Sequence, residues 1–163
     1  MKCNPNLKYY IMTDNDVTIN FLEIENVLNK YMPFYKNAIG GTIVYNYLDT
    51  GYIGGGVIFM TRKAVLTACA YILNIGHFPG SLLPGINKLN PMANVDVYIA
   101  AIVQNLGGEI IHLPGAYTRS SYCGYPLEYV TQPIIASQHS YGEDKPTLPQ
   151  HDEVLEFMLN FEG

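Results

Sequence analysis

Apolar and polar positions along this chain repeat with two different periods, and the change of period separates strands from helices. Residues 8–13 form an apolar and aromatic run that predicts a buried strand. Over residues 18–31 apolar side chains recur every three or four positions, as on one face of a helix, and Pro33 ends this pattern. The Gly40–Gly41 pair then opens a β-branched and aromatic run, residues 42–45, that predicts another strand.

The rest of the chain continues this alternation of strands and helices. We expect a strand within residues 51–60, a helix capped by Thr61 and running through Ile72, a helix over 97–106, strands at 109–113 and 134–136, and a last helix over 152–160. Residues 74–93, which contain two Pro-Gly pairs, and residues 116–132 are expected to be loops. The order predicts one α/β domain, residues 1–163, with a partly parallel sheet.

Charge and cysteine content narrow the function classes. The formal net charge is −5 and the nine Lys and Arg residues are scattered, which argues against nucleic-acid binding. Cys3, Cys69 and Cys123 lack metal-ligand spacing, and an odd number is no disulfide framework, although a Cys3–Cys123 bond stays open. Because no apolar run reaches membrane-spanning length and no leader pattern opens the chain, we expect it to be soluble as given.

Candidate chemistry begins where the first predicted strand ends. Asp14 and Asp16 stand one residue apart at that point, so both carboxylates can face one small volume. Two interpretations stay open. The pair can cap the helical pattern that follows, or it can hold a hard divalent cation that keeps positions free for phosphate oxygens. A transferase uses such an ion to neutralise a diphosphate leaving group.

Three further features each have a structural and a chemical interpretation. Gly54, Gly55 and Gly56 precede an apolar run, which is typical of a bulge or of backbone that lets a sugar ring approach closely. Asp96 opens a predicted helix, where it can serve as a cap or as a general base facing a cleft. His139 follows a short apolar run and is either an ordinary histidine or a ligand for manganese.

In their order along the chain, these motifs resemble the Fringe-like and β1,3-galactosyltransferase family. That family has an Asp-x-Asp strand end, a glycine segment before a helix, an Asp-Val motif, a Leu-Gly turn and a late histidine. The matching segments here are Asp14-Asn15-Asp16, Gly54-Gly55-Gly56 with Thr61-Arg62, Val95-Asp96-Val97-Tyr98, Leu106-Gly107-Gly108 and His139. The resemblance covers most of residues 8–115 and is thin beyond them.

The resemblance implies a GT-A-like mixed sheet flanked by helices and an inverting, metal-dependent hexosyl transfer. The donor would be a nucleotide sugar, UDP-linked, and the acceptor a glycan or glycoprotein. The implied manganese ligands are Asp14, Asp16 and His139, with Asp14 acting through metal-bound water or on the donor ribose. The glycines Gly54, Gly55 and Gly56 would lie against the donor, and Asp96 would be the base. The resemblance also implies the Golgi lumen, behind a membrane anchor that we do not find in this chain.

Two departures from the family pattern shape these expectations. Val95 stands where the family has a second acidic residue. The family's nucleotide-binding half precedes the Asp-x-Asp strand, whereas only seven residues precede Lys8 here. We therefore expect the chain to correspond to the metal- and acceptor-binding half, with a partner chain or an upstream domain completing the donor site. A catalytically inactive, glycosyltransferase-like binding module stays open as the alternative, and a metal-dependent hydrolase would need a denser set of ligands.

Overall fold

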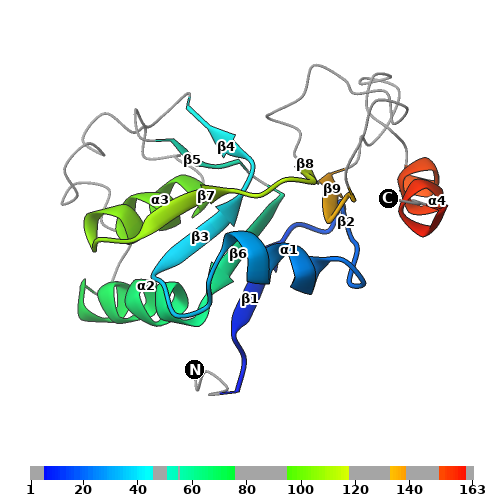
Figure 1. The fold of residues 1–163 in the computed structure, drawn as a ribbon. Coiled ribbons are helices and arrows are strands. Elements are labelled where there is room, and N and C mark those ends of the chain that lie inside the picture. Colours follow the sequence, from blue (N-terminus) through cyan, green and yellow to red (C-terminus); the bar gives the residue numbers. More distant parts are fainter. Residues whose placement is uncertain are drawn as a thin grey trace.

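The computed structural model describes residues 6–45, 51–54, 56–75, 95–117, 133–138 and 151–160. Its elements are β1 (Tyr9–Thr13), β2 (Val17–Ile19), α1 (Ile24–Tyr31), β3 (Ala38–Gly41), β4 (Ile43–Val44), β5 (Tyr52–Ile53), β6 (Val57–Thr61), α2 (Arg62–Ile75), α3 (Val95–Asn105), β7 (Glu109–His112), β8 (Ala116–Tyr117), β9 (Ala136–Gln138) and α4 (His151–Asn160) (Figure 1). This arrangement confirms the mixed α/β class. The predictions for Cys3, Gly55, Cys123, His139, the loop beyond Ile75 and residues 118–132 lie outside the described residues.

The central sheet has four strands in the order β1-β6-β3-β7. Strand β6 runs antiparallel to both of its neighbours, whereas β7 runs parallel to β3. A second sheet has the order β2-β9-β8, in which β8 and β9 are parallel, and β4 pairs with β5. The predicted partly parallel sheet is therefore confirmed, with most of the described pairings antiparallel.

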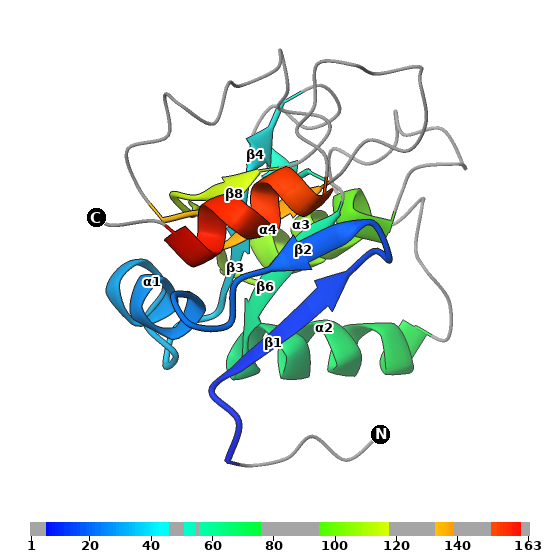
Figure 2. The same cartoon turned by 90° about the vertical axis from the view of Figure 1, so that its right-hand side faces the viewer.

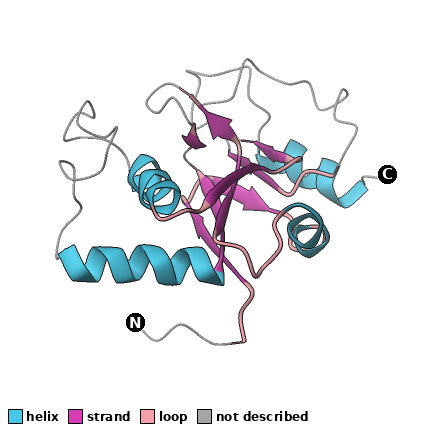
Figure 3. Ribbon diagram, turned by 60° about the vertical axis from the view of Figure 1, so that its left-hand side comes forward, coloured by secondary structure: helices cyan, strands magenta, loops and turns pink. Residues whose placement is uncertain are grey.

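Strand β6 shows how the central sheet divides the core into two. Ile58 packs on one face with residues of α2 and α3, including Ala64 and Ile102. Its neighbours Val57 and Phe59 pack on the other face, against α1 and the second sheet. Successive side chains of a strand point to opposite faces, so a run that is apolar throughout requires cover on both sides. Figure 3 shows helices on both sides of the strands.

The helix predicted over residues 18–31 is wrong in its first part. Val17–Ile19 form strand β2, which pairs antiparallel with β9, and α1 begins only at Ile24, after the N-cap residue Glu23. The β-branched residues of β2 favour a strand, and its partner comes from the far end of the sequence. Neither Asp14 nor Asp16 therefore caps α1, so the capping interpretation of this pair is wrong.

Two other strand predictions are displaced. The Gly40–Gly41 pair lies inside β3 rather than opening a strand, and residues 42–45 contribute only β4. A side chain on Gly40 would bring its Cβ within 2.7 Å of Leu113 Cδ1, so glycine here permits close packing. The strand predicted at residues 134–136 begins at Ala136 and continues to Gln138, where it pairs with β2.

The start of α2 is as predicted, because Thr61 caps it. The backbone N–H of Ala64 donates to Thr61 Oγ1 at 3.2 Å, and the Thr61 hydroxyl lies 2.7 Å from the carbonyl oxygen of Lys36, to which it donates. This buried side chain thereby ties the junction of β6 and α2 to the segment that leads into β3. Across the described residues no helix combines the length and the apolar character needed to cross a membrane.

Candidate functional site

A cavity of about 340 Å³ lies at the carboxyl end of β1. Three segments form it, namely residues 12–14 at the end of β1, residues 56–58 at the start of β6, and Val95 and Asp96 in the first turn of α3. Its volume falls near the lower end of the range for small-molecule sites. Ligands of α/β proteins bind beyond the carboxyl ends of strands, and this cavity has that position.

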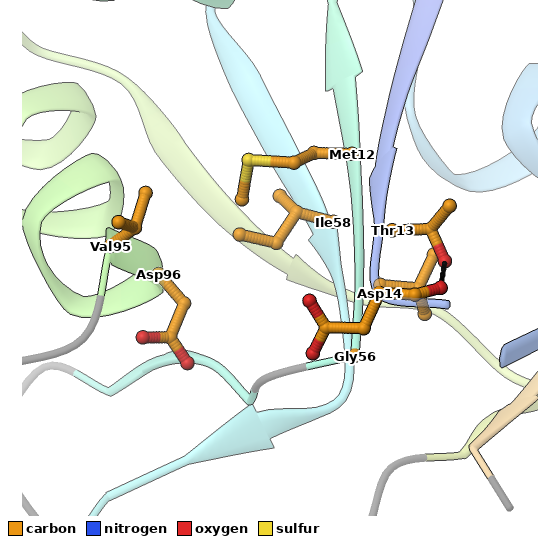
Figure 4. Close-up of a pocket in the computed structure, with 8 residues that line it drawn as sticks. Met12, Thr13, Asp14, Gly56, Ile58, Val95 and Asp96 are labelled. Carbon is orange, nitrogen blue, oxygen red and sulfur yellow. Dashed lines mark hydrogen bonds between the residues drawn. The ribbon is translucent and has the colours of Figure 1, made fainter. Parts of the chain in front are cut away.

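The backbone at Asp14 is fixed by the strand that it leaves. The Asp14 N–H donates to the Gly56 carbonyl at 2.9 Å, which continues the β1–β6 pairing one residue beyond Thr13 and Val57. The Thr13 hydroxyl donates to the Asp14 carbonyl oxygen at 3.1 Å. The Asp14 side chain itself is exposed and points into the cavity (Figure 4).

Asp96 lies in the first turn of α3 and is only 8% exposed. Its Oδ1 accepts a hydrogen bond from the Val97 N–H at 2.8 Å, so part of the predicted capping role is present. Burial raises the pKa of the Asp96 carboxyl above its ordinary value, and the charge of Asp14 raises it further, while backbone hydrogen bonds partly offset the shift. The raised pKa makes Asp96 a stronger base than an exposed carboxylate.

The two carboxylates point toward each other across the cavity (Figure 4). Asp14 and Asp96 belong to elements that are far apart in the sequence, and the fold brings their charged ends to one volume. Like charges that face each other raise the affinity of the site for a proton or a cation. The structure therefore brings together two of the residues that the sequence singled out.

Asp16 takes a different direction from Asp14. It is 8% exposed, and Gln138 Nε2 donates to its two carboxylate oxygens at 3.3 and 3.2 Å. Asp16 is not among the described residues that line the cavity. Its partner Gln138 packs against Gly56, and Gly56 does line the cavity. The predicted grouping of Asp16 with His139 stays a prediction.

Gln138 is a partner that the sequence interpretation missed. Its place at the end of a short apolar run, immediately before His139, was the available signal. The pairing of β2 with β9 sets Gln138 opposite Val17 and so brings its amide to Asp16. That pairing spans most of the chain, which is why local patterns did not show it.

The glycine segment leads into β6 through a turn, which is the structural one of its two interpretations. The Gly54 N–H donates to the Thr42 carbonyl at 2.7 Å, and Gly56 turns into β6 with a φ of +105°, a conformation that favours glycine. Gly56 also lines the cavity, but a side chain here would point toward Gln138 and Val17, outside the lining, so glycine at this position makes room for Gln138. The turn and the close packing against Gln138 thus fall on the same residue, and the approach of a sugar ring to these glycines stays a prediction.

An apolar wall completes the cavity and was not predicted from the sequence. Met12 and Ile58 lie beside one another on β1 and β6, and Val95 faces the cavity from α3 (Figure 4). Val95 is 50% exposed. An apolar side chain therefore occupies the position at which an acidic residue was expected from the family pattern.

The donor set at this cavity suits a hard cation that binds together with phosphate. Among the described residues no three His, Cys, Asp or Glu side chains are grouped so that they could hold a metal ion by themselves. Magnesium-type sites in phosphate-binding enzymes commonly use one or two carboxylates, and substrate oxygens supply the rest. Carboxylate oxygens also suit manganese. Asp14 fits that pattern as a single carboxylate that points into the cavity.

The chain matches no model of a known protein family, and no curated protein sequence matches it. What can be inferred about its function comes from the cavity and the residues around it.

Proposed function

We propose that this protein is a glycosyltransferase, which transfers a sugar from a nucleotide-sugar donor, UDP-linked, to an acceptor sugar hydroxyl with inversion. The observation that carries the proposal is that Asp14 and Asp96 face each other across a cavity at the carboxyl end of β1. The mixed sheet with helices on both faces is compatible with a GT-A-like fold. The order of motifs that resembles the Fringe-like and β1,3-galactosyltransferase family supports the same class.

Asp96 is the general base of the proposed reaction. It accepts the proton of the acceptor hydroxyl, whose oxygen forms a bond to the anomeric carbon. The bond from that carbon to the diphosphate oxygen breaks, and the diphosphate leaves with the electron pair. Burial raises the pKa of Asp96, which favours this proton transfer.

Asp14 would hold the divalent cation from the side of the cavity. Asp16 and His139, the other ligands that the family resemblance implies, stay predictions, since Asp16 lies outside the described lining of the cavity. When bound, manganese or magnesium neutralises the charge that develops on the departing diphosphate. Gln138 fixes the direction of the Asp16 carboxylate, and Gly56 leaves the space that the Gln138 side chain fills. The cavity volume of about 340 Å³ is near the lower end of the range for small-molecule sites, so we propose that a partner chain or an upstream domain binds the nucleoside.

Hydrolysis of nucleotide sugars in the presence of manganese tests this proposal. We expect manganese-dependent release of nucleoside diphosphate from one or a few donors by the wild-type protein. The Asp14→Asn variant should lose most of this release, because the cation loses a charged ligand. Glu109→Gln is the matched control, since it removes one acidic charge from the exposed surface of β7, outside the cavity. Equal activity of the wild type and Asp14→Asn would contradict the proposal.

The second candidate function is a glycosyltransferase-like module that binds a glycan or a partner without turnover. Val95 favours it, because this half-exposed apolar side chain faces the cavity where the family pattern has an acid. Calorimetry separates the two candidates. Manganese-dependent binding of a donor without any release of nucleoside diphosphate, with and without acceptor glycans, would identify the inactive module.

A further inference from the structure

A second cavity, of about 440 Å³, lies at the opposite end of β1. Residues 6–8 before the strand, Phe34 and Tyr35 after α1, and the first turns of α2 form its walls. Three of the nine Lys and Arg residues of the chain, Lys8, Arg62 and Lys63, line it. No acidic side chain is among the described residues of its lining.

This concentration of positive charge stands against the overall charge of the chain. The chain carries a formal net charge of −5. The first turn of α2 contains Arg62 and Lys63 and no acidic residue. Because the N-terminal end of a helix carries a partial positive charge, cations there are unfavourable and anions favourable. The side chains therefore form a site of positive potential that suits an anion.

Two exposed aromatic rings form the other wall of this second cavity. Phe34 is 49% and Tyr35 67% exposed, and their rings meet edge to face with centroids 5.8 Å apart. Lys8 Nζ lies 5.5 Å from the centroid of the Phe34 ring, which holds this cation at the mouth. Aromatic surface left in water beside cations is typical of recognition rather than of packing.

Backbone hydrogen bonds hold the walls of this cavity in place. The Arg62 N–H donates to the Lys8 carbonyl at 3.0 Å, so the start of α2 is fixed to the segment before β1 (Figure 2). The Lys36 N–H donates to the Pro33 carbonyl at 3.0 Å and closes the turn that carries the two aromatic residues. Walls that are fixed before binding reduce the entropy lost when a ligand enters.

We propose that the second cavity binds a small ligand in which a phosphate, sulfate or carboxylate group is attached to a ring. Lys8, Arg62 and Lys63 would contact the anionic group, and Phe34 and Tyr35 the ring. The site lies at the other end of β1 from Asp14, so the proposal is independent of the transferase activity. A nucleotide and a sugar phosphate share this chemistry.

Calorimetry of the full chain with three probes tests the proposal and separates the two sources. The probes are uridine monophosphate, glucose 6-phosphate and inorganic phosphate, each with EDTA present so that the acidic cavity holds no cation. We expect at least one ring-bearing phosphate to bind about fivefold more tightly than inorganic phosphate, since the ring adds contacts with the aromatic side chains that phosphate alone cannot make. Preference for the nucleotide or the sugar phosphate identifies the source. Equal affinity for all three probes, or no binding, would overturn the proposal.

Matched variants place the binding in this cavity. Lys8→Gln should lower the affinity for the preferred probe by about threefold or more, because the variant loses a positive charge that lies beside both the aromatic ring and the proposed anion. Lys30→Gln is the control, because Lys30 Nζ also lies over an aromatic ring, 5.1 Å from that of Tyr31, but outside the cavity. Equal weakening by both variants would show a general effect of net charge and would overturn the proposal.

The aromatic wall has a test of its own. Tyr35→Ser changes a side chain that is 67% exposed, so folding should be preserved, and circular dichroism can verify this. The variant should lose affinity for the ring-bearing probe and keep its affinity for inorganic phosphate. An unchanged ratio between the two probes would mean that the rings do not contact the ligand.

Discussion

The two ends of β1 carry opposite charges. At its carboxyl end Asp14 and Asp96 face a cavity with an apolar wall, and at its start Lys8, Arg62 and Lys63 surround another beside exposed aromatic rings. Both arrangements oppose folding, since one faces two carboxylates against each other and the other places cations at a helix N-terminus. Side chains whose placement lowers the stability of the folded protein mark the positions where function is expected.

The two ends differ in that the acidic one contains a buried charged group, Asp96. Asp96 is 8% exposed, whereas Lys8 and Lys63 are exposed to water. Charges in contact with solvent are screened, and their interactions are weak, while a buried carboxylate is sensitive to each neighbour. Changes at the acidic end should therefore have larger effects than changes at the basic end or elsewhere on the surface.

The largest expected effect is the loss of turnover in Asp96→Asn. Asparagine keeps an oxygen for the Val97 N–H but cannot accept the acceptor's proton. Turnover should fall by about 10²- to 10⁴-fold while the KM for the donor changes little, as loss of a general base does. Steady-state kinetics with manganese and an acceptor measures both. Full turnover together with lower stability would show that Asp96 is only a cap.

Local patterns predicted the fold where local interactions decide it. Thr61 marks the start of α2, and Pro33 follows the end of α1, because caps and breakers act within a few residues. Val17–Ile19 were mistaken for helix because their strand partner, Ala136–Gln138, lies at the other end of the sequence. Pairing across that distance depends on the tertiary fold and leaves no local period.

The candidate site divides in the same way. Asp14 and Asp96 were predicted from their places at a strand end and a helix start, which are readable in sequence. The partner of Asp16, Gln138, and the apolar wall of Met12 and Ile58 follow from strand register, so only the structure shows them. The basic cavity was missed because Lys8, Arg62 and Lys63 form no run in the sequence.

The next largest effect should be a loss of stability on substitution of Gly56. This residue lies between the cavity that Asp14 and Asp96 face and the Gln138 side chain that holds Asp16. In Gly56→Ala the alanine would have to keep a φ of +105°, which is unfavourable for any residue with a side chain. Its Cβ would also lie 3.0 Å from Cδ of Gln138, whose amide donates to Asp16. We expect a loss of about 2–3 kcal/mol in the free energy of unfolding, from strain and from this contact. Urea denaturation measures it.

Gly107→Ala is the control for that prediction. Gly107 also has a positive φ, +72°, but a Cβ there would meet no atom within 4 Å. It should therefore show strain alone, about 1 kcal/mol. Equal losses in the two variants would mean that the contact with Gln138 contributes nothing.

The ionised Asp96 carboxylate should also lower the free energy of unfolding at neutral pH, compared with an uncharged side chain at this position. Its pKa in the folded protein is raised above the ordinary value of 3.8, chiefly by burial and also by Asp14. The stabilisation that it provides is complete below its unfolded pKa and is lost as the pH rises through the folded one. Asp96→Asn should therefore be the more thermostable protein at pH 7, with an advantage that shrinks toward pH 4. Thermal unfolding between pH 4 and pH 8 measures the difference, and a constant difference would contradict it.

The smallest effect is expected from an acidic group that belongs to neither end of β1. Glu109 pairs with Lys36 at 3.0 Å, and both side chains are about half exposed, at 53% and 41%. An exposed pair contributes about 0–1 kcal/mol, so Glu109→Gln should barely change unfolding, and turnover and phosphate binding should stay at wild-type values. Both Glu109→Gln and Asp96→Asn remove one negative charge from the chain. A loss of turnover in Glu109→Gln comparable to that in Asp96→Asn would show that net charge, rather than the facing carboxylates, controls activity, and the contrast between the two ends of β1 would then have no functional meaning.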